Sequence, residues 1–143
     1  MNYMNPIKKI IGTRTDFPAF VPPTLTCKPP VTVRTALRDL ECAAENKAFS
    51  HIWSKANATT KQGNRRMIAD RPGYTIRAEC HGNIQFHYLL PRRISMREAA
   101  RIQSFPDTFI FPCGLRETER QIGNAVPPVL GWHIANALKK AVQ

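Results

Sequence analysis

The chain has 143 residues and a formal net charge of +11, from 21 Lys and Arg against 10 Asp and Glu. This length suits one domain, but five of the 12 prolines lie between Pro18 and Pro30 and the apolar runs are short, which favours part of a larger assembly. No apolar run approaches the roughly 20 residues of a membrane span. The N-terminus also lacks the features of a signal peptide, so we expect a cytoplasmic protein without a membrane partner.

The four cysteines contain no C-x-x-C pair, so the sequence signals neither a zinc site nor a disulfide framework. The positive charge is uneven, because the stretch from Lys55 to Gln103 holds ten basic residues and three acidic ones. Eight of the ten are Arg, whose planar fork suits phosphates and guanine edges. This pattern favours a polyanionic partner, of which a chromosome is the commonest, and a basic surface kept for solubility is the alternative.

Residues 1–48 are expected to form a linker and one helix. A short strand is possible at 7–13, and the prolines predict an extended connector at 16–30. Thr32 can cap a helix over 32–40, whose apolar stripe is Val33, Ala36, Leu37 and Leu40.

Residues 49–91 have no helical period. Gly and Pro punctuate them, and short β-prone runs occur at 74–76 and 84–86, so we expect irregular loops on a small sheet. Residues 92–143 are predicted to be mainly helical. Ser95 and Glu98 form a capping box for a helix that stops before Pro106, and a last helix follows Pro127 and Pro128.

Two segments resemble the closing motifs of the C5 cytosine DNA methyltransferases. Residues 92–107 (RRISMREAARIQSFPD) resemble the ninth motif of the family, and residues 121–128 (QIGNAVPP) resemble the tenth. Both are long, have few free positions and stand in the family's order. Less strictly, residues 62–66, 74–78 and 81–83 look like recognition loops and a strand of the family's target recognition domain.

The resemblance implies an α+β fold: a small irregular β target-recognition domain, with C-terminal helices that pack on a Rossmann-like methyltransferase domain. The family's cofactor loop, Pro-Cys nucleophile motif and Glu-Asn-Val motif are not found in these residues. The chain therefore looks like the small subunit of a divided enzyme, which needs a catalytic large subunit. An inactive remnant, a cut fragment or a stand-alone DNA-binding module remain alternatives, and the apolar last helix could drive self-association.

The family uses a Cys thiolate, a Glu and S-adenosylmethionine to methylate a cytosine that has left the helix. Cys113 follows a proline, as the family's nucleophile does, but it lies after the ninth motif. We expect it to be a packing residue, and no catalytic residue is assigned to this chain.

The resemblance and residue chemistry together imply a set of DNA contacts. Arg, Asn and Gln side chains suit base edges, and Thr75 and Arg77 match a strand that holds phosphates in the family. Gly82 could serve a close backbone approach or a positive φ. The expected DNA-binding residues are Gln62, Arg65, Arg66, Thr75, Arg77, His81, Gly82, Asn83 and Arg93.

In the family, the turn matching Asn124, Ala125 and Val126 closes over the methionine end of the cofactor. Asn124 could also cap the last helix. For Arg97 we favour a structural role over phosphate contact, and we leave Arg101 open. Trp53 is assigned to packing, with base stacking as the alternative.

Overall fold

The computed structural model describes residues 29–55, 65–78 and 85–142, and divides the chain into two compact units. One unit comprises residues 27–130, and the other joins residues 1–26 with residues 131–143. The expected strand at 7–13 and most of the proline-rich connector lie outside the described residues. None of the described helices is long and apolar enough to cross a membrane.

Helix α2 (Val33–Leu37) continues into a 3-10 turn, η1 (Arg38–Leu40), as the apolar stripe predicts. The Thr32 hydroxyl accepts the N–H of Thr35 and caps the helix. Val33, Leu37 and Leu40 are buried, so the stripe forms the packed face.

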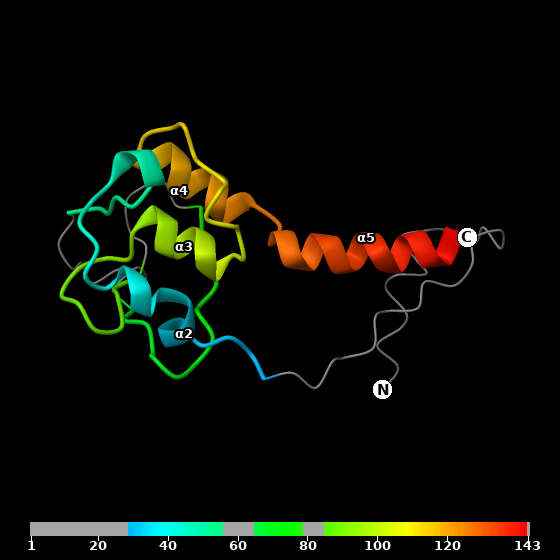
Figure 1. Ribbon diagram of the computed structural model, residues 1–143, viewed down its shortest axis with the longest axis horizontal. Coiled ribbons are helices and arrows are strands. Elements are labelled where there is room, and N and C mark those ends of the chain that lie inside the picture. Colours follow the sequence, from blue (N-terminus) through cyan, green and yellow to red (C-terminus); the bar gives the residue numbers. More distant parts are fainter. Residues whose placement is uncertain (1–28, 56–64, 79–84, 143) are drawn as a thin grey trace. The chain divides into compact units, whose positions relative to one another are not determined.

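Helix α3 (Met96–Ile102) lies between α2 and α4 (Leu115–Asn124) and contacts both (Figure 1). All five residues from Met96 to Ala100 are buried. A helix that is buried around most of its circumference is the centre of a core and not a surface element. The motif-like segment at 92–107 therefore forms the middle of this unit.

Helix α4 was not predicted from the sequence. Only Leu115 and Ile122 are large apolar residues in it, and Thr118 and Glu119 complete its buried face. A helix whose inner face is half polar gives little hydrophobic periodicity, which is the signal that sequence analysis relies on. The last helix, α5 (Pro128–Val142), begins with a proline in its first turn, as expected.

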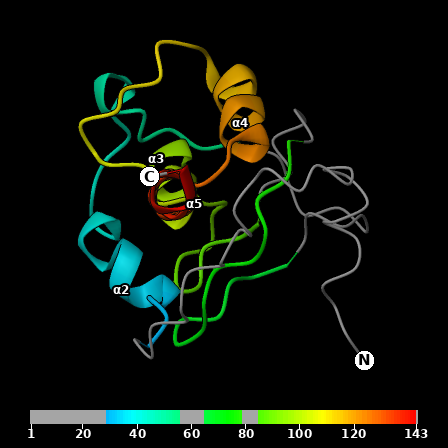
Figure 2. The ribbon, with the colours of Figure 1, turned by 90° about the vertical axis from the view of Figure 1, so that its right-hand side faces the viewer.

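The small sheet predicted for 49–91 does not form strands within the described residues. Three isolated bridges occur instead, and two of them involve Phe86, which pairs with Arg66 and with Arg93. The extended stretches near 65–67, 85–87 and 92–94 lie side by side in Figure 2. Gly and Pro, and the lack of continuous alternation, explain why pairing stops after one or two residues. A short 3-10 turn, η2 (Lys47–Phe49), precedes this region.

Candidate functional site

The capping box at the start of α3 is present, and it is extended by a buried ion pair. The Ser95 hydroxyl accepts the N–H of Glu98 at 3.0 Å, and the Glu98 carboxylate accepts the N–H of Ser95 at 2.7 Å. Arg92 donates to both oxygens of the same carboxylate at 2.8 Å. Because Glu98 is completely buried, this bidentate partner supplies the charge that a buried carboxylate needs.

Trp53 packs against this ion pair. The Arg92 guanidinium lies 4.3 Å from the centroid of the Trp53 ring, and the Lys55 ammonium lies 4.5 Å from it. Both are cation–π distances. The half-buried indole is thus in contact with two cations of its own chain, which favours packing over stacking on a base.

Arg97 is fully buried and joins three backbone segments. Its guanidinium donates to the carbonyl oxygens of Phe49, Pro106 and Phe109, at 2.9, 3.3 and 2.8 Å. Burial lowers the pKa of this guanidinium, and the nearby Asp107 carboxylate opposes that shift. The placement supports the structural role favoured for this residue.

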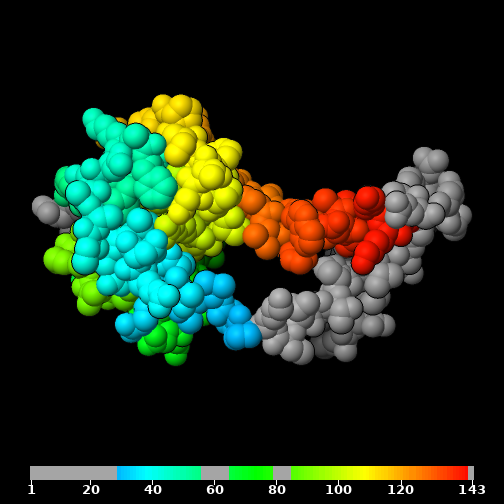
Figure 3. All heavy atoms as spheres, viewed as in Figure 1, coloured from blue at the N-terminus to red at the C-terminus, as the bar shows by residue number. Residues whose placement is uncertain are grey.

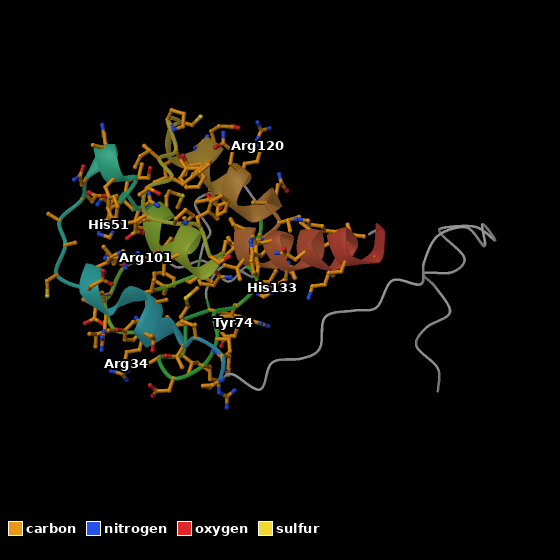
Figure 4. The ribbon with its side chains drawn as sticks, turned by 45° about the vertical axis from the view of Figure 1, so that its right-hand side comes forward. Arg34, His51, Tyr74, Arg101, Arg120 and His133 are labelled. Carbon is orange, nitrogen blue, oxygen red and sulfur yellow. The ribbon has the colours of Figure 1, made fainter. Side chains whose placement is uncertain are left out.

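Arg101, one helical turn after Arg97, also binds groups of its own chain. It donates to both carboxylate oxygens of Asp107, at 2.9 and 2.6 Å, and to Asp39 at 2.6 Å. These bonds raise the pKa of Arg101 and lower the pKa of both carboxyls. Figure 4 labels Arg101 on α3, and Figure 3 shows the stretch near 105–112 packed against the stretch near 38–50.

The DNA contact predicted for Arg93 does not fit the structure. Its exposed fraction is only 1%, and its guanidinium lies 4.6 Å from the centroid of the Phe86 ring. Burial lowers its pKa, opposed by the charge of Glu119. A side chain in this position cannot reach a phosphate. The physical reason is that the side chain packs on the Phe86 ring and interacts with the charge of Glu119, which the sequence alone does not reveal.

Residues Tyr74–Ala78, here called the recognition segment, are extended and present alternate side chains to solvent. Ile76 is buried in the core, whereas Thr75 and Arg77 are exposed. Two-residue alternation places Thr75 and Arg77 on one face. The Gln85 amide donates to the Thr75 carbonyl oxygen at 3.2 Å, which fixes the backbone of the segment.

Two of the predicted base-contacting arginines lie beside this segment. Arg65 is exposed, and its guanidinium lies 5.7 Å from the centroid of the Tyr74 ring, labelled in Figure 4. Arg66 donates to the carbonyl oxygens of His87 and Leu90, so part of its guanidinium has a structural function. Arg65 thus packs against the recognition segment, on which Thr75 and Arg77 share the exposed face. Gln62, His81, Gly82 and Asn83 lie outside the described residues.

Asn124, Ala125 and Val126, here called the cofactor turn, follow directly from α4. Asn124 is the last residue of the helix, and the N–H of Ala125 donates to the Ile122 carbonyl oxygen. Gln103 also donates to that oxygen, at 3.2 Å, so α3 holds the end of α4. Asn124 and Val126 are exposed, Val126 with 64% of its surface. The turn therefore offers an amide, which both donates and accepts, beside an apolar side chain.

Ser104 performs the capping function that was considered for Asn124. It has a left-handed backbone, with φ of 63°, and its hydroxyl accepts the N–H of Val129 in the first turn of α5 at 3.2 Å. This φ lies in the left-handed region, which disfavours most residues with a Cβ.

Cys113 lies in the loop before α4 and is half-buried. Its carbonyl oxygen accepts the Thr118 hydroxyl, and the Gln121 amide donates to its sulfur at 3.4 Å. These neighbours supply no base for the thiol, in keeping with a packing residue. The described residues contain no cluster of His, Cys, Asp and Glu with the arrangement of a metal site.

Two buried histidines were not identified from the sequence. His51 hydrogen-bonds to the Ser95 hydroxyl at 2.8 Å, and His87 accepts the N–H groups of Leu89 and Leu90 at Nδ1. With Nδ1 an acceptor, the neutral ring of His87 carries its proton on Nε2, 3.7 Å from Glu98. Burial lowers the pKa of both rings.

Comparison with known proteins agrees with the family resemblance of the two motifs. Residues 23–140 match the model of the C-5 cytosine-specific DNA methylases. The chain belongs to this family.

The chain is similar to a protein named type II methyltransferase M.OihORF3336P, from Oceanobacillus iheyensis, with 47% identity over 55% of this chain and 18% of that protein. For type II methyltransferase M.AgeI from Thalassovita gelatinovora, the identity is 45% over 54% of this chain and 19% of that protein. DNA (cytosine-5)-methyltransferase 3 of Arabidopsis thaliana is 46% identical over 40% of this chain and 4% of its own length. The matched part thus spans less than a fifth of each relative.

Proposed function

We propose that this chain is the DNA-recognition part of a DNA (cytosine-5-)-methyltransferase and that it completes the cofactor pocket. The enzyme would transfer a methyl group from S-adenosylmethionine to cytosine in a specific double-stranded DNA site. The nucleophilic Cys and the Glu would come from a catalytic large subunit, because the 143 residues contain neither motif. The observation that carries this proposal is family membership over residues 23–140, together with the exposed basic recognition segment.

The DNA-binding role rests on the region around the recognition segment. Thr75 and Arg77 share an exposed face, and Arg65 packs against Tyr74 of the same segment. A hydroxyl and two guanidinium groups on and next to one segment suit phosphate oxygens and guanine edges. Gln62, His81, Gly82 and Asn83, which neighbour this region in the sequence, remain proposed contacts.

The cofactor role rests on the cofactor turn. When bound, S-adenosylmethionine supplies an electrophilic methyl group on a sulfonium centre. Asn124 can donate to or accept from the polar amino-acid end of the cofactor, and Val126 can pack against its aliphatic part. The backbone of the turn is set by the Ile122 carbonyl, which accepts from Ala125 and from Gln103.

A partner chain is supported by the exposed apolar side chains near and along α5. Val129, Leu130, Trp132, Ile134 and Leu138 each have at least 40% of their surface exposed. Several exposed apolar residues on one helix are typical of an interface. The catalytic large subunit is the partner that family membership suggests, and self-association of the isolated chain is the competing outcome.

The test combines the chain with the remaining N-terminal part of M.AgeI, to which it is 45% identical over 82 residues. Radiolabelled S-adenosylmethionine and plasmid DNA report methyl transfer. We expect no transfer by either part alone and measurable transfer by the pair. An equivalent mixture in which the chain carries Val126→Asp serves as control and should lose activity. Turnover by the purified single chain would contradict the divided-enzyme proposal.

A further inference from the structure

Gly123 in the last turn of α4 lies directly against the backbone of the recognition segment. A Cβ atom added to Gly123 would stand 2.5 Å from the Arg77 carbonyl carbon and 2.7 Å from the Ala78 Cα, and closer still to the Ala78 nitrogen. Real Cβ atoms do not approach backbone atoms this closely. The helix end and the segment are therefore in backbone-to-backbone contact, which only glycine permits.

The position of this glycine is otherwise unfavourable. Gly is the poorest helix former apart from proline, and Gly123 lies within the range of α4. Its φ is not in the left-handed region, so conformational freedom does not explain it. Close approach to the recognition segment is the property that remains.

The contact with Gly123 lies next to Arg77, one of the two residues of the segment whose side chains face solvent. Ala78 follows Arg77 directly, and Thr75 lies on the same face two residues earlier. Ile76 anchors this stretch in the core and Gln85 holds the Thr75 carbonyl. Gly123 supplies a third restraint at Arg77 and Ala78, the end of the segment that Ile76 and Gln85 do not hold.

We propose that Gly123 is a positioning residue for DNA contact, which acts by fixing the backbone that carries Arg77 against the end of α4. This rests on the proposed function, because it takes Arg77 as a phosphate contact. A larger residue at 123 would push the segment away from the helix and displace the Arg77 guanidinium from the phosphate. DNA affinity would then fall although no DNA-contacting side chain had changed.

The test is a double-variant cycle on the full chain, with Gly123→Ala, Arg77→Ala and both together. Gly114→Ala is the matched control, because it lies at the other end of α4 and an added Cβ there meets no atom within 4 Å. Fluorescence anisotropy with a labelled DNA duplex gives the Kd between about 50 and 200 mM salt.

We expect Gly123→Ala and Arg77→Ala each to weaken binding and to lower the salt slope by about 0.9, because each leaves one phosphate without its cation. The Kd of the double variant should be lower, by about threefold or more, than the value obtained by multiplying the two single-variant increases. Such a shortfall is expected for residues that act through one contact. Gly114→Ala should bind like the wild type. Full multiplication of the two effects, or wild-type binding by Gly123→Ala, would overturn the proposal.

A measurement on the unaltered chain covers the case in which Gly123→Ala does not fold. The amide resonance of Gly123 should shift when the duplex is added, while that of Gly114 stays in place, and an unmoved Gly123 resonance overturns the proposal. The proposed function fails separately. A wild-type chain that does not bind DNA overturns both, whereas binding that Arg77→Ala leaves unchanged overturns only the role of Gly123.

Discussion

Arg97 contacts Phe49 in two ways at once: its Nε donates to the Phe49 carbonyl oxygen at 2.9 Å, and its guanidinium lies 4.5 Å from the centroid of the Phe49 ring. The two residues are 48 positions apart in the chain. The same side chain reaches the carbonyls of Pro106 and Phe109. The structural role predicted for Arg97 is therefore that of a cross-link between residue 49 and residues 106–109.

Replacing Arg97 by Met should destabilise the chain strongly. The substitution leaves three carbonyl oxygens without their donors, and each buried unsatisfied group costs about 1–3 kcal/mol, so we expect a loss of about 3 kcal/mol or more. Arg97→Lys should recover little, because one ammonium cannot reproduce the fork. Urea unfolding followed by circular dichroism measures the change. The exposed Arg116→Met is the control, and equal stabilities for the two Met variants would contradict the role of Arg97.

Ser104 should tolerate Gly better than Ala. Both substitutions remove the hydrogen bond to the Val129 N–H, which contributes about 1 kcal/mol. Gly regains a similar amount because the left-handed backbone costs a residue with a Cβ about 1–2 kcal/mol. We therefore expect Ser104→Gly to be near neutral and Ser104→Ala to lose about 1 kcal/mol in the same unfolding experiment. The opposite order would show that the left-handed backbone of Ser104 does not limit stability, and wild-type stability of both variants would show that the hydrogen bond does not contribute.

The stability of the chain should fall as the pH is lowered from neutrality. Burial lowers the pKa of His51 and His87, so both stay neutral in the folded chain and take up protons in the unfolded chain first. Their contribution is complete above the unfolded value of about 6.5 and is lost as the pH falls towards their folded pKa. A second loss follows below about pH 4, where the carboxyls of Asp39 and Asp107, whose pKa is lowered by Arg101, become protonated.

Thermal melts between pH 7.5 and 5 measure the first loss. His87→Gln is the informative variant, because the glutamine oxygen can accept the N–H groups of Leu89 and Leu90 and does not titrate. The variant should show a shallower dependence of Tm on pH than the wild type. An identical slope would mean that His87 titrates alike in the folded and unfolded chains.

Arg65→Ala should relax the sequence preference of the assembled enzyme. A bidentate Arg–guanine contact contributes about 1–3 kcal/mol of discrimination, so the ratio of methylation at the preferred site and at a site with one changed base pair should fall by about tenfold or more. Bisulfite sequencing of a mixed plasmid library reads this ratio for the pair with the M.AgeI fragment. Arg71→Ala, also an exposed arginine, is the control. An unchanged preference would show that Arg65 does not contact a base.

Local chemistry made part of the fold predictable. The hydroxyl of Thr32 and the capping box of Ser95 and Glu98 act within three residues, so their spacing in the sequence is sufficient to identify them. Helix α4 could not be found in this way, because Thr118 and Glu119 occupy its buried face. The α+β class and the packing on a Rossmann-like domain stay predictions.

The sequence predicted the family to which the candidate site belongs, but it predicted the positions of the site residues only in part. The recognition segment has alternation that the sequence displays, whereas the directions of Arg93, Arg97 and Arg101 depend on contacts with distant chain segments. Charge in a sequence does not distinguish an arginine that faces a phosphate from one that binds carbonyl groups inside the protein. Of the ten basic residues between Lys55 and Gln103, Arg66, Arg92, Arg97 and Arg101 donate to backbone carbonyl oxygens, and Arg93 is buried against Phe86.

The cross-links made by Arg97 and Arg101 have an evolutionary consequence. Within the part of the chain that the structure describes, each of their hydrogen bonds joins α3 to residues before 50 or after 105, and none involves residues 65–78. Side chains in that intervening stretch can therefore be exchanged without breaking these bonds. A lineage built on such a scaffold could acquire a new target sequence through exposed residues such as Thr75 and Arg77 while these cross-links stay in place.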